Sequence, residues 1–328
     1  MSALLTVENL TVQLPVGGSL RTVLRDVSLS IAPGEALGLV GESGSGKSMT
    51  ARAIDRLLPP GAQTSGSIVF SNQNVLGATS QELRRYRADV AMIFQDPRAH
   101  TNPVRRIGDF MTEALRCKGV PQAEALERAV ETLEQVGVSR AHAVARQYPH
   151  ELSGGMLQRV MIGAALLTSP KLLLADEPTT ALDVTIQAEV MAILDELRRS
   201  LGLAMLFITH DLELAAAICD RTAVMYAGQI VETRASSSLH SDPLHPYTAA
   251  LSAARPDVTR TLPRLRAIPG RPLSAFEAPE GSCAFAPRCG HASPDCLANM
   301  PDLISLDGGM TRCIRAAELR GHLEALDA

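Results

Sequence analysis

Eight consecutive residues, Gly41 to Ser48, have the residue types and the spacing of a phosphate-binding loop. They read Gly-Glu-Ser-Gly-Ser-Gly-Lys-Ser and fit the pattern G-x-x-x-x-G-K-[ST]. Glycines allow backbone N–H groups to turn toward an anion, and the N-terminus of a following helix adds partial positive charge. In such a loop Lys47 reaches the β- and γ-phosphates of a nucleotide, and the Ser48 hydroxyl binds Mg²⁺.

An ordinary glycine-rich turn is the alternative interpretation of these residues. The predicted strand before the loop and the predicted helix after it favour nucleotide binding, because the motif requires both. The predicted nucleotide-binding residues are Gly41, Glu42, Ser43, Gly44, Ser45, Gly46, Lys47, Ser48 and Met49.

Two adjacent carboxylates follow an apolar run in the second half of the chain. The run at 172–175 reads Leu-Leu-Leu-Ala and leads into Asp176 and Glu177. Open α/β sheets bind ligands at the carboxyl ends of their strands, where Asp176 can hold Mg²⁺ and Glu177 can polarise an attacking water. Alone, such a pair lies more often in a solvated loop, but the phosphate loop in the same chain favours catalysis. His210 follows another apolar run and is expected at the same edge, although a lone histidine there is more often structural.

These residues require a sheet of buried strands connected by helices. The run at 36–40 predicts a strand buried on both faces, and a helical pattern follows at 48–58. Apolar residues recur at helical spacing over 107–136, broken at Gly119 and Pro121. Strands that alternate with helices indicate an α/β layered fold. Further strands are predicted at 23–31, 90–94, 172–175, 204–208 and 222–226.

The composition is that of a globular protein without a nucleic-acid footprint. The 328 residues are 46% hydrophobic and 20% charged, with a formal net charge of −4. No run of lysines and arginines stands out, so no nucleic-acid partner is expected. No stretch approaches the roughly 18–20 apolar residues of a membrane-spanning helix, and residues 1–12 lack the pattern of a signal peptide. A cytosolic location is therefore expected.

The character of the chain changes after Ser238. Ten prolines lie between residues 243 and 301, and the apolar periodicity fades. Residues 239–328 are therefore predicted to form a small irregular appendage that cannot build a core unaided. Four of the six cysteines lie in this tail, and the other two, Cys117 and Cys219, are expected to be small buried side chains.

The sequence Leu-Ser-Gly-Gly-Met at 152–156 resembles the signature motif of ABC ATPases. The other motifs of that family occur in the family's order, and these motifs span most of residues 4–233. The resemblance implies an ABC-type P-loop ATPase core at 1–238, with a mixed central sheet, an antiparallel β subdomain and a helical signature subdomain at about 96–168. The remaining motifs are the phosphate loop, Gln95, Asp176-Glu177, Ala181-Leu182-Asp183 and His210.

The resemblance also implies residue roles and a head-to-tail dimer of two ATPase subunits. Glu177 is implied as the general base, Gln95 as the sensor of Mg²⁺ and the attacking water, and His210 as a contact to the γ-phosphate. Asp183 belongs to the implied D-loop. The implied Mg²⁺ ligands are Ser48, Gln95 and Asp176. The residues implied to act on the ATP of the partner subunit are Ser153, Gly154, Gly155 and Met156.

Other segments resemble the oligopeptide/dipeptide (peptide/nickel) importer branch of the family. Met156, Thr180 and Thr185 resemble the D-type subunit of these importers, which use two different ATPases. Members usually carry an aromatic residue that stacks on adenine, whereas residues 13–24 contain none and leave Leu14 or Leu20 as the nearest candidate. The segments that carry the likeness are Phe-Gln-Asp-Pro at 94–97, Asn-Pro at 102–103, Tyr-Pro-His-Glu-Leu at 148–152, the run at 175–187 and His-Pro-Tyr-Thr at 245–248.

This branch implies a motor that hydrolyses ATP to power uptake of di- or oligopeptides or a related small solute across the inner membrane. The implied partners are an F-type ATPase subunit in a heterodimer, two transmembrane permeases and, indirectly, a periplasmic or extracellular solute-binding protein. The subunit is implied to be peripheral on the cytoplasmic face. Nickel, opine or glutathione-like solutes use the same motor and remain open. A soluble ABC ATPase acting on nucleic acid or ribosomes is disfavoured, because the chain has one core and no basic patch.

The four tail cysteines are separated by five, six and sixteen residues. These gaps are wider than those of zinc ribbons and unlike the tight ferredoxin run, so spacing alone names no metal. The segment at 281–289, however, resembles the tail of D- and F-type importer ATPases, which in some members binds a [4Fe–4S] cluster. The resemblance implies such a cluster, with zinc or free thiols as alternatives. Its implied ligands are Cys283, Cys289, Cys296 and Cys313.

Overall fold

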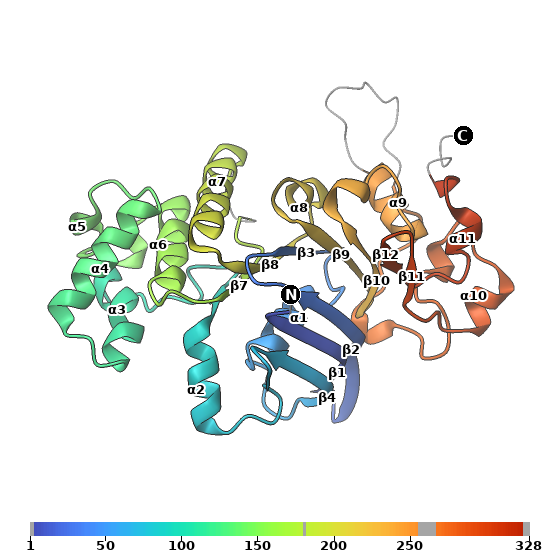
Figure 1. Cartoon of the computed structure of the whole chain (residues 1–328), viewed down its shortest axis with the longest axis horizontal. Coiled ribbons are helices and arrows are strands. Elements are labelled where there is room, and N and C mark those ends of the chain that lie inside the picture. Colours follow the sequence, from blue (N-terminus) through green and yellow to red (C-terminus); the bar gives the residue numbers. More distant parts are fainter. Residues whose placement is uncertain (1–2, 180–181, 255–266, 324–328) are drawn as a thin grey trace. The chain divides into compact units, whose positions relative to one another are not determined.

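The computed structural model describes residues 3–179, 182–254 and 267–323 (Figure 1). Within these ranges no helix is long and apolar enough to cross a membrane. The chain divides into two compact units. The first, the loop unit, comprises Leu5–Ser30, Ala36–Leu76 and Phe207–Ala328. The second, the helical unit, comprises Met1–Leu4, Ile31–Glu35 and Gly77–Leu206. Thr180 and Ala181, which belong to the predicted motifs, lie outside the described residues.

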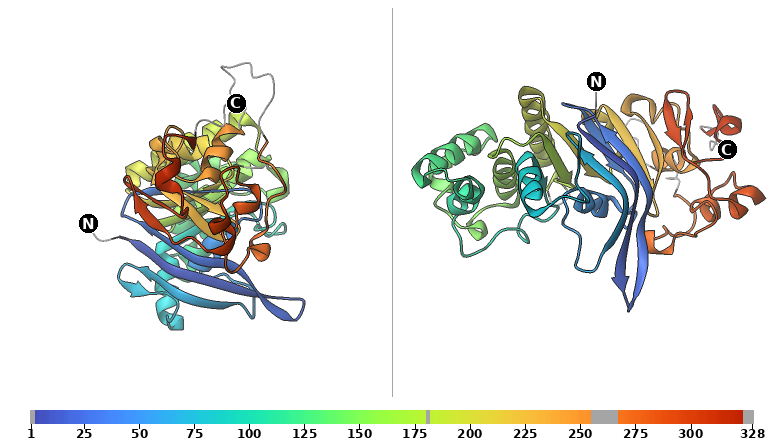
Figure 2. Two further views of the ribbon diagram at one scale, coloured as in Figure 1. Left: turned by 90° about the vertical axis from the view of Figure 1, so that its right-hand side faces the viewer. Right: turned by 60° about the horizontal axis from the view of Figure 1, so that its bottom comes forward.

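The loop unit contains an antiparallel sheet with the strand order β2-β1-β4-β5. Figure 2 shows β1 and β2 as two long strands side by side. Leu5 of β1 pairs with Phe70 of β4, and the register shifts between Glu8 and Thr11. Opposite this bulge lies Gly66, whose missing side chain would meet the carbonyl oxygen of Asn9 at 2.5 Å. The strands are β1 Leu5–Val16, β2 Ser19–Ile31, β4 Gln63–Phe70 and β5 Gln73–Asn74.

A second group of strands in the loop unit positions the phosphate loop. β3 is buried at every position, as predicted, and pairs in parallel with β9. From β9 the sheet continues through β10 and β12 to β11, with each pair antiparallel. The predicted helix after the loop is α1, which ends four residues earlier than expected. The bounds are β3 Ala36–Val40, α1 Lys47–Ile54, α8 Leu212–Ile218, β9 Arg221–Tyr226, β10 Gln229–Ala235, β11 Ile304–Leu306 and β12 Gly309–Thr311.

The C-terminal tail belongs to the loop unit and contains more regular structure than an irregular appendage would. Thr311 of β12 pairs with Glu232 of β10, so the tail adds a hairpin to the sheet that carries the phosphate loop. Strands of three residues are too short to give a periodic pattern. The hairpin turn, Asp307-Gly308, has positive φ at both residues, and Asp-Gly is a strong signal for such a two-residue turn. The tail helices are α9 Pro246–Ala253, α10 Pro294–Ala298 and α11 Ala316–Leu319.

The helical unit combines two parallel strands with a group of packed helices. β6 and β7 are neighbours, with Ile93 opposite Ala175. Helices α3, α4 and α6 pack together, and Gly163 of α6 makes room for Met111, whose Cε would lie 3.3 Å from an added Cβ. The chain passes into the loop unit within β8. The bounds are α2 Ser80–Asp89, β6 Val90–Ile93, α3 Ile107–Cys117, α4 Gln122–Gln135, α5 Ala141–Val144, α6 Gly154–Leu166, β7 Leu172–Asp176, α7 Val184–Leu201 and β8 Ala204–Thr209.

Local sequence signals set the ends of these helices. The predicted interruption at Gly119 and Pro121 is confirmed, because it separates α3 from α4. Thr79 and Glu82 form a capping box that begins α2. Gly202 ends α7 in the left-handed conformation. Within the helical insertion expected after β6, the break at Gly119 and Pro121 and the Ser153 cap of α6 are local signals, whereas α3 and α4 begin without a side-chain cap.

Leu39 tests the burial of β3. This side chain is fully buried, so Leu39→Ala is expected to lower the free energy of unfolding by ~2–5 kcal/mol through lost apolar contact and a residual cavity. Urea unfolding followed by circular dichroism measures the change. Leu297→Ala is the matched control, because Leu297 is 61% exposed in α10 of the same unit. Equal stability of the two variants would contradict the buried placement of Leu39.

Candidate functional site

The predicted phosphate loop connects β3 to α1 in the loop unit. Gly46 is the N-cap of α1 and has a φ of 109°, a backbone conformation that favours glycine. No side chain among the described residues caps this helix, so its N-terminus presents backbone N–H groups and partial positive charge. Gly41 packs against the end of β9, where an added Cβ would lie 2.1 Å from the carbonyl oxygen of Met225. Both glycines are therefore required by the backbone path.

Lys47 and Ser45 give this loop the chemistry of an anion site. Lys47 Nζ donates to the carbonyl oxygens of Gly41 at 2.8 Å and Glu42 at 3.1 Å, and its side chain is buried. The buried Ser45 Oγ has no hydrogen-bond partner within the described residues. An oriented ammonium group, a buried hydroxyl and an uncapped helix N-terminus together fit the phosphates of a nucleotide. Ser48 and Met49 follow in the first turn of α1.

Glu42 in the same loop is held by the C-terminal tail. Arg288 Nη1 and Nη2 donate to its two carboxylate oxygens at 2.7 and 3.1 Å. The backbone N–H of Glu42 donates to Tyr247 Oη at 3.1 Å. Arg288 and Tyr247 were not among the predicted site residues. A partner 246 positions away leaves no signal in a single sequence.

The start of α9, which carries Tyr247, is fixed by two buried side chains. His245 Nδ1 accepts a hydrogen bond from Tyr247 N at 3.0 Å, and burial lowers the pKa of His245 to about 3, so the ring stays neutral. The Glu232 carboxylate of β10 accepts from the N–H groups of Leu244 and His245, at 2.9 Å each. Burial raises the pKa of Glu232 to about 7. These contacts tie α9 to the same sheet that positions the phosphate loop.

The structure brings two of the predicted catalytic residues together in the helical unit. Gln95 follows β6 and Glu177 follows β7, and these strands are parallel neighbours. Gln95 Nε2 donates to Glu177 Oε2 at 2.9 Å. Asp176 is buried at the end of β7, whereas Glu177 has a φ of 46°. Such left-handed backbone is uncommon outside glycine and concentrates at functional sites.

The predicted signature residues form the start of α6 in the helical unit. Ser153 is the N-cap, and its Oγ accepts a hydrogen bond from Met156 N at 3.3 Å. Gly154 is exposed, while Gly155 packs on α7, where an added Cβ would lie 2.7 Å from Ile186 Cγ2. Asp183 caps α7 by accepting from Thr185 N and Ile186 N, both at 3.1 Å. The signature therefore forms a helix N-terminus, and packing against α7 requires a glycine at position 155.

His210 follows β8 and is exposed in the loop unit. The two units thus each hold part of the predicted machinery. The loop unit has residues 41–49 and His210, and the helical unit has Gln95, Asp176, Glu177, Asp183 and the signature. The Mg²⁺ ligand set of Ser48, Gln95 and Asp176 draws on both units and stays a prediction.

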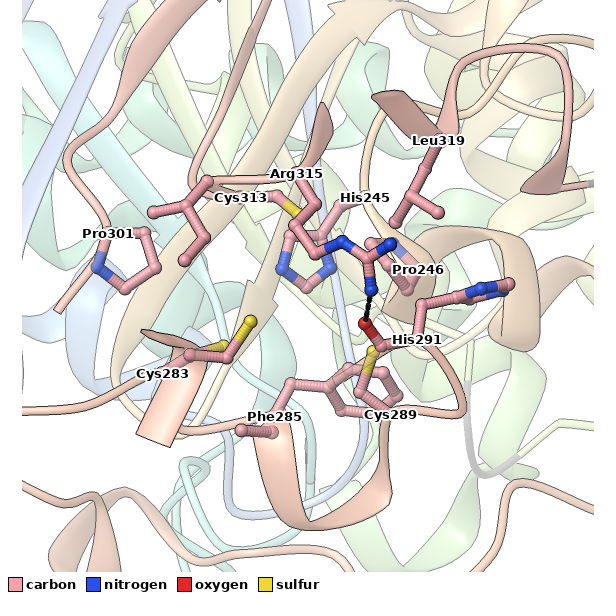
Figure 3. A pocket seen from close by; sticks show the side chains of 13 residues that line it. His245, Pro246, Cys283, Phe285, Cys289, His291, Pro301, Cys313, Arg315 and Leu319 are labelled. Carbon is pink, nitrogen blue, oxygen red and sulfur yellow. Dashed lines mark hydrogen bonds between the residues drawn. The ribbon is translucent and has the colours of Figure 1, made fainter. Parts of the chain in front are cut away.

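The iron–sulfur prediction for the tail is wrong. Cys283, Cys289, Cys296 and Cys313 all line one cavity, shown in Figure 3. Nevertheless, no group of three or more Cys, His, Asp or Glu side chains in the described part of the chain is arranged to hold a metal ion. Burial raises the pKa of Cys283 and Cys289, and that of Cys313 to about 11.

These four cysteines form no disulfide with one another, and zinc has no more support among the described residues than the cluster. Arg315, which also lines the cavity, donates to the carbonyl oxygen of His291 (Figure 3). Of the two other cysteines, Cys219 is buried as predicted, whereas Cys117 is exposed at the last position of α3.

Two family models match the chain. Residues 24–180 match the model described as ABC transporter, and residues 231–296 match the oligopeptide/dipeptide transporter, C-terminal region. The oligopeptide transport ATP-binding protein OppD of Escherichia coli is 42% identical over 96% of this chain and 94% of its own length. OppD of Haemophilus influenzae is 42% identical over 97% of this chain and 99% of its own length.

Solved structures of ATP-binding cassettes have the same fold. A dimeric structure of MJ0796, a bacterial ABC transporter cassette, is 28% identical, with a TM-score of 0.64 over 71% of this chain and 98% of that one. The structure of cbiO1 from Clostridium perfringens, part of the ABC transporter complex cbiONQ, is 25% identical, with a TM-score of 0.63 over 74% and 92%. The fold, the order of the motifs and the 42% identity over nearly the full length show that the chain belongs to the ATP-binding proteins of the ABC transporter family.

Proposed function

We propose that this chain hydrolyses ATP to power the import of oligopeptides. The observation that supports this most directly is the extent of the likeness. Relatives named oligopeptide transport ATP-binding proteins match 94% to 99% of their own lengths, and the tail matches the C-terminal region of oligopeptide/dipeptide transporters. The likeness therefore covers the part of the chain that distinguishes this branch as well as the cassette.

In this proposal the loop binds the phosphates of ATP. The N–H groups at the start of α1 donate to phosphate oxygens. Lys47 gives up a hydrogen bond to a loop carbonyl and binds the β- and γ-phosphates instead. The Ser48 hydroxyl, Gln95 and Asp176 are the oxygen ligands proposed for Mg²⁺, which supplies positive charge at the phosphates when it is bound with ATP. His210 is proposed to contact the γ-phosphate.

Glu177 is proposed as the general base for the attacking water. Its carboxylate accepts a hydrogen bond from Gln95, which orients it, and a carboxylate oxygen can accept a proton from water. The strained backbone at Glu177 supports this role, because positive φ at a non-glycine residue is retained where the side-chain position matters.

The signature is proposed to act on ATP held by a second ATPase subunit. Ser153, Gly154, Gly155 and Met156 form a helix N-terminus, which suits a γ-phosphate presented from outside this chain. The proposed assembly is a heterodimer with an F-type subunit beneath two permeases, on the cytoplasmic face of the membrane. An external solute-binding protein delivers the peptide. Asp183, at the start of α7, belongs to the same proposed dimer face.

Glu177→Gln is expected to bind Mg·ATP but to hydrolyse it at least ~100-fold more slowly in the assembled transporter. The amide still accepts the hydrogen bond from Gln95 yet cannot take a proton from water. Phosphate release measures the rate. Glu124→Gln, at an exposed ion pair with Arg128, is the control and is expected to turn over normally. Near wild-type turnover by the Glu177 variant would exclude its role as the base.

Lys47→Ala is expected to weaken Mg·ATP binding by at least ~10-fold, because it removes a charge that faces the phosphates. Isothermal titration calorimetry measures the dissociation constant. Lys171→Ala is the control, since Lys171 forms an exposed pair with Asp89 and its loss is expected to leave binding unchanged. Unaltered ATP affinity in the Lys47 variant would remove the nucleotide site from this loop.

The solute is tested by the ATPase activity of the transporter assembled with its permeases and its binding protein. Oligopeptides are expected to stimulate hydrolysis severalfold at micromolar concentration, while nickel or glutathione leaves the basal rate unchanged. The Glu177→Gln transporter controls for contaminating ATPase. Stimulation by nickel or glutathione alone would replace the peptide with that solute and leave the motor function intact.

A further inference from the structure

We infer that the C-terminal tail holds the phosphate-binding loop in the conformation that accepts nucleotide phosphates, with Arg288 and Tyr247 as positioning residues that act through Glu42. This role presupposes the proposed ATP site and adds the tail to it. The contacts that carry it all lie within the loop unit.

The tail bonds to Glu42, one of the two loop residues whose carbonyl oxygens orient Lys47. The ammonium group of Lys47 is held by the carbonyl oxygens of Gly41 and Glu42. The direction of these carbonyls depends on how the peptide groups on either side of Glu42 are turned. A contact that fixes Glu42 therefore also fixes the position from which Lys47 meets a phosphate.

Arg288 fixes the side chain of Glu42. Its bidentate pair with the carboxylate has both geometric specificity and charge, and only 4% of the Arg288 side chain is exposed. The guanidinium is itself constrained, because Nε donates to the carbonyl oxygen of Pro269 at 2.8 Å and Nη1 also contacts Tyr226 Oη at 3.4 Å. Arg288 therefore cannot follow a displaced Glu42 without losing other bonds.

Tyr247 fixes the backbone of Glu42. Its hydroxyl accepts the hydrogen bond of the Glu42 N–H, so this one donor of the loop is directed to the tail. The fully buried ring packs on Tyr226 and Phe285, with centroids 4.7 and 5.3 Å away. Because α9 is tied to β10 through Glu232, the position of the hydroxyl is set by the sheet.

A third contact lies two residues further along the loop. The N–H of Ala275 in the tail donates to the carbonyl oxygen of Gly44 at 3.1 Å. This turn of the tail is braced by Ser274, whose side chain accepts from Phe276 N, and by an ion pair between Arg271 and Glu277. The tail thus holds a side chain, an N–H and a carbonyl of the loop.

The alternative is that these contacts only anchor the tail. Arg312 serves as the control for Arg288. It is also a buried arginine of the tail, but its ion-pair partner lies outside the phosphate loop. Its Nη2 donates to Asp26 Oδ2 at 2.8 Å, and its other donors contact the carbonyl oxygens of Ile230 and Pro301. Loss of Arg312 therefore removes an anchor of similar burial without touching residues 41–48.

The test compares full-length variants for Mg·ATP affinity by calorimetry and for KM and kcat in the assembled transporter. Tyr247→Phe removes only the hydroxyl and keeps the ring, and is expected to raise the dissociation constant about 3- to 10-fold. Arg288→Met is expected to raise it at least about 10-fold. Arg288→Lys keeps the charge but loses the bidentate geometry, so an intermediate value is expected. KM rises with the dissociation constant, while kcat at saturating ATP stays within about twofold.

Arg312→Met is expected to lower thermal stability as Arg288→Met does, yet to bind ATP with wild-type affinity. An equal rise of the dissociation constant in both variants would show general destabilisation and overturn the positioning role. Wild-type affinity in Tyr247→Phe and Arg288→Met, alongside lost binding in Lys47→Ala, would overturn it while the ATP site stands. Wild-type affinity in Lys47→Ala would overturn the site itself. If Arg288→Met does not fold, Tyr247→Phe decides between these outcomes.

Discussion

A loop that binds phosphate through its backbone cannot use all of its N–H groups for its own structure, and this constraint shapes the loop unit. Most of the donors must stay available, so the loop is held largely by other means and gives up only the Glu42 N–H to the tail. Gly41 packs against the end of β9, Gly46 turns the chain into α1, and the tail bonds to Glu42 and Gly44. Lys47 is held by loop carbonyls that these contacts orient. The glycines and the distant tail residues together hold the loop in place while most of its N–H groups stay available to a phosphate.

The fold could be predicted where the signals are local. The buried strand β3, the break between α3 and α4, and the carboxyl-edge position of Glu177 all follow from short patterns, and the structure has them. The hairpin of β11 and β12 was missed because each strand has three residues, although its Asp-Gly turn was a readable signal. The Arg288–Glu42 pair could not be predicted, since ion pairing across 246 positions depends on the assembled fold.

The tail cysteines show the limit of transferring a site by resemblance. Their gathering around one cavity agrees with a common role, but lining a cavity is a weaker condition than ligation. Ligation needs several donors aimed at one point, and it needs thiolates. The described residues contain no such donor set. The segment that suggested the cluster also contains Arg288, whose partner is the phosphate loop.

The hairpin that the tail adds to β10 also affects how the protein behaves in solution. An unpaired strand at the edge of a sheet exposes backbone donors and acceptors to other chains and invites aggregation. β10 has seven residues, whereas β11, at the end of the strand order, has three. The tail therefore covers the middle of β10, where Glu232 and Thr233 pair with β12, and leaves the three-residue β11 as the terminal strand, which offers few free backbone groups for edge-to-edge association.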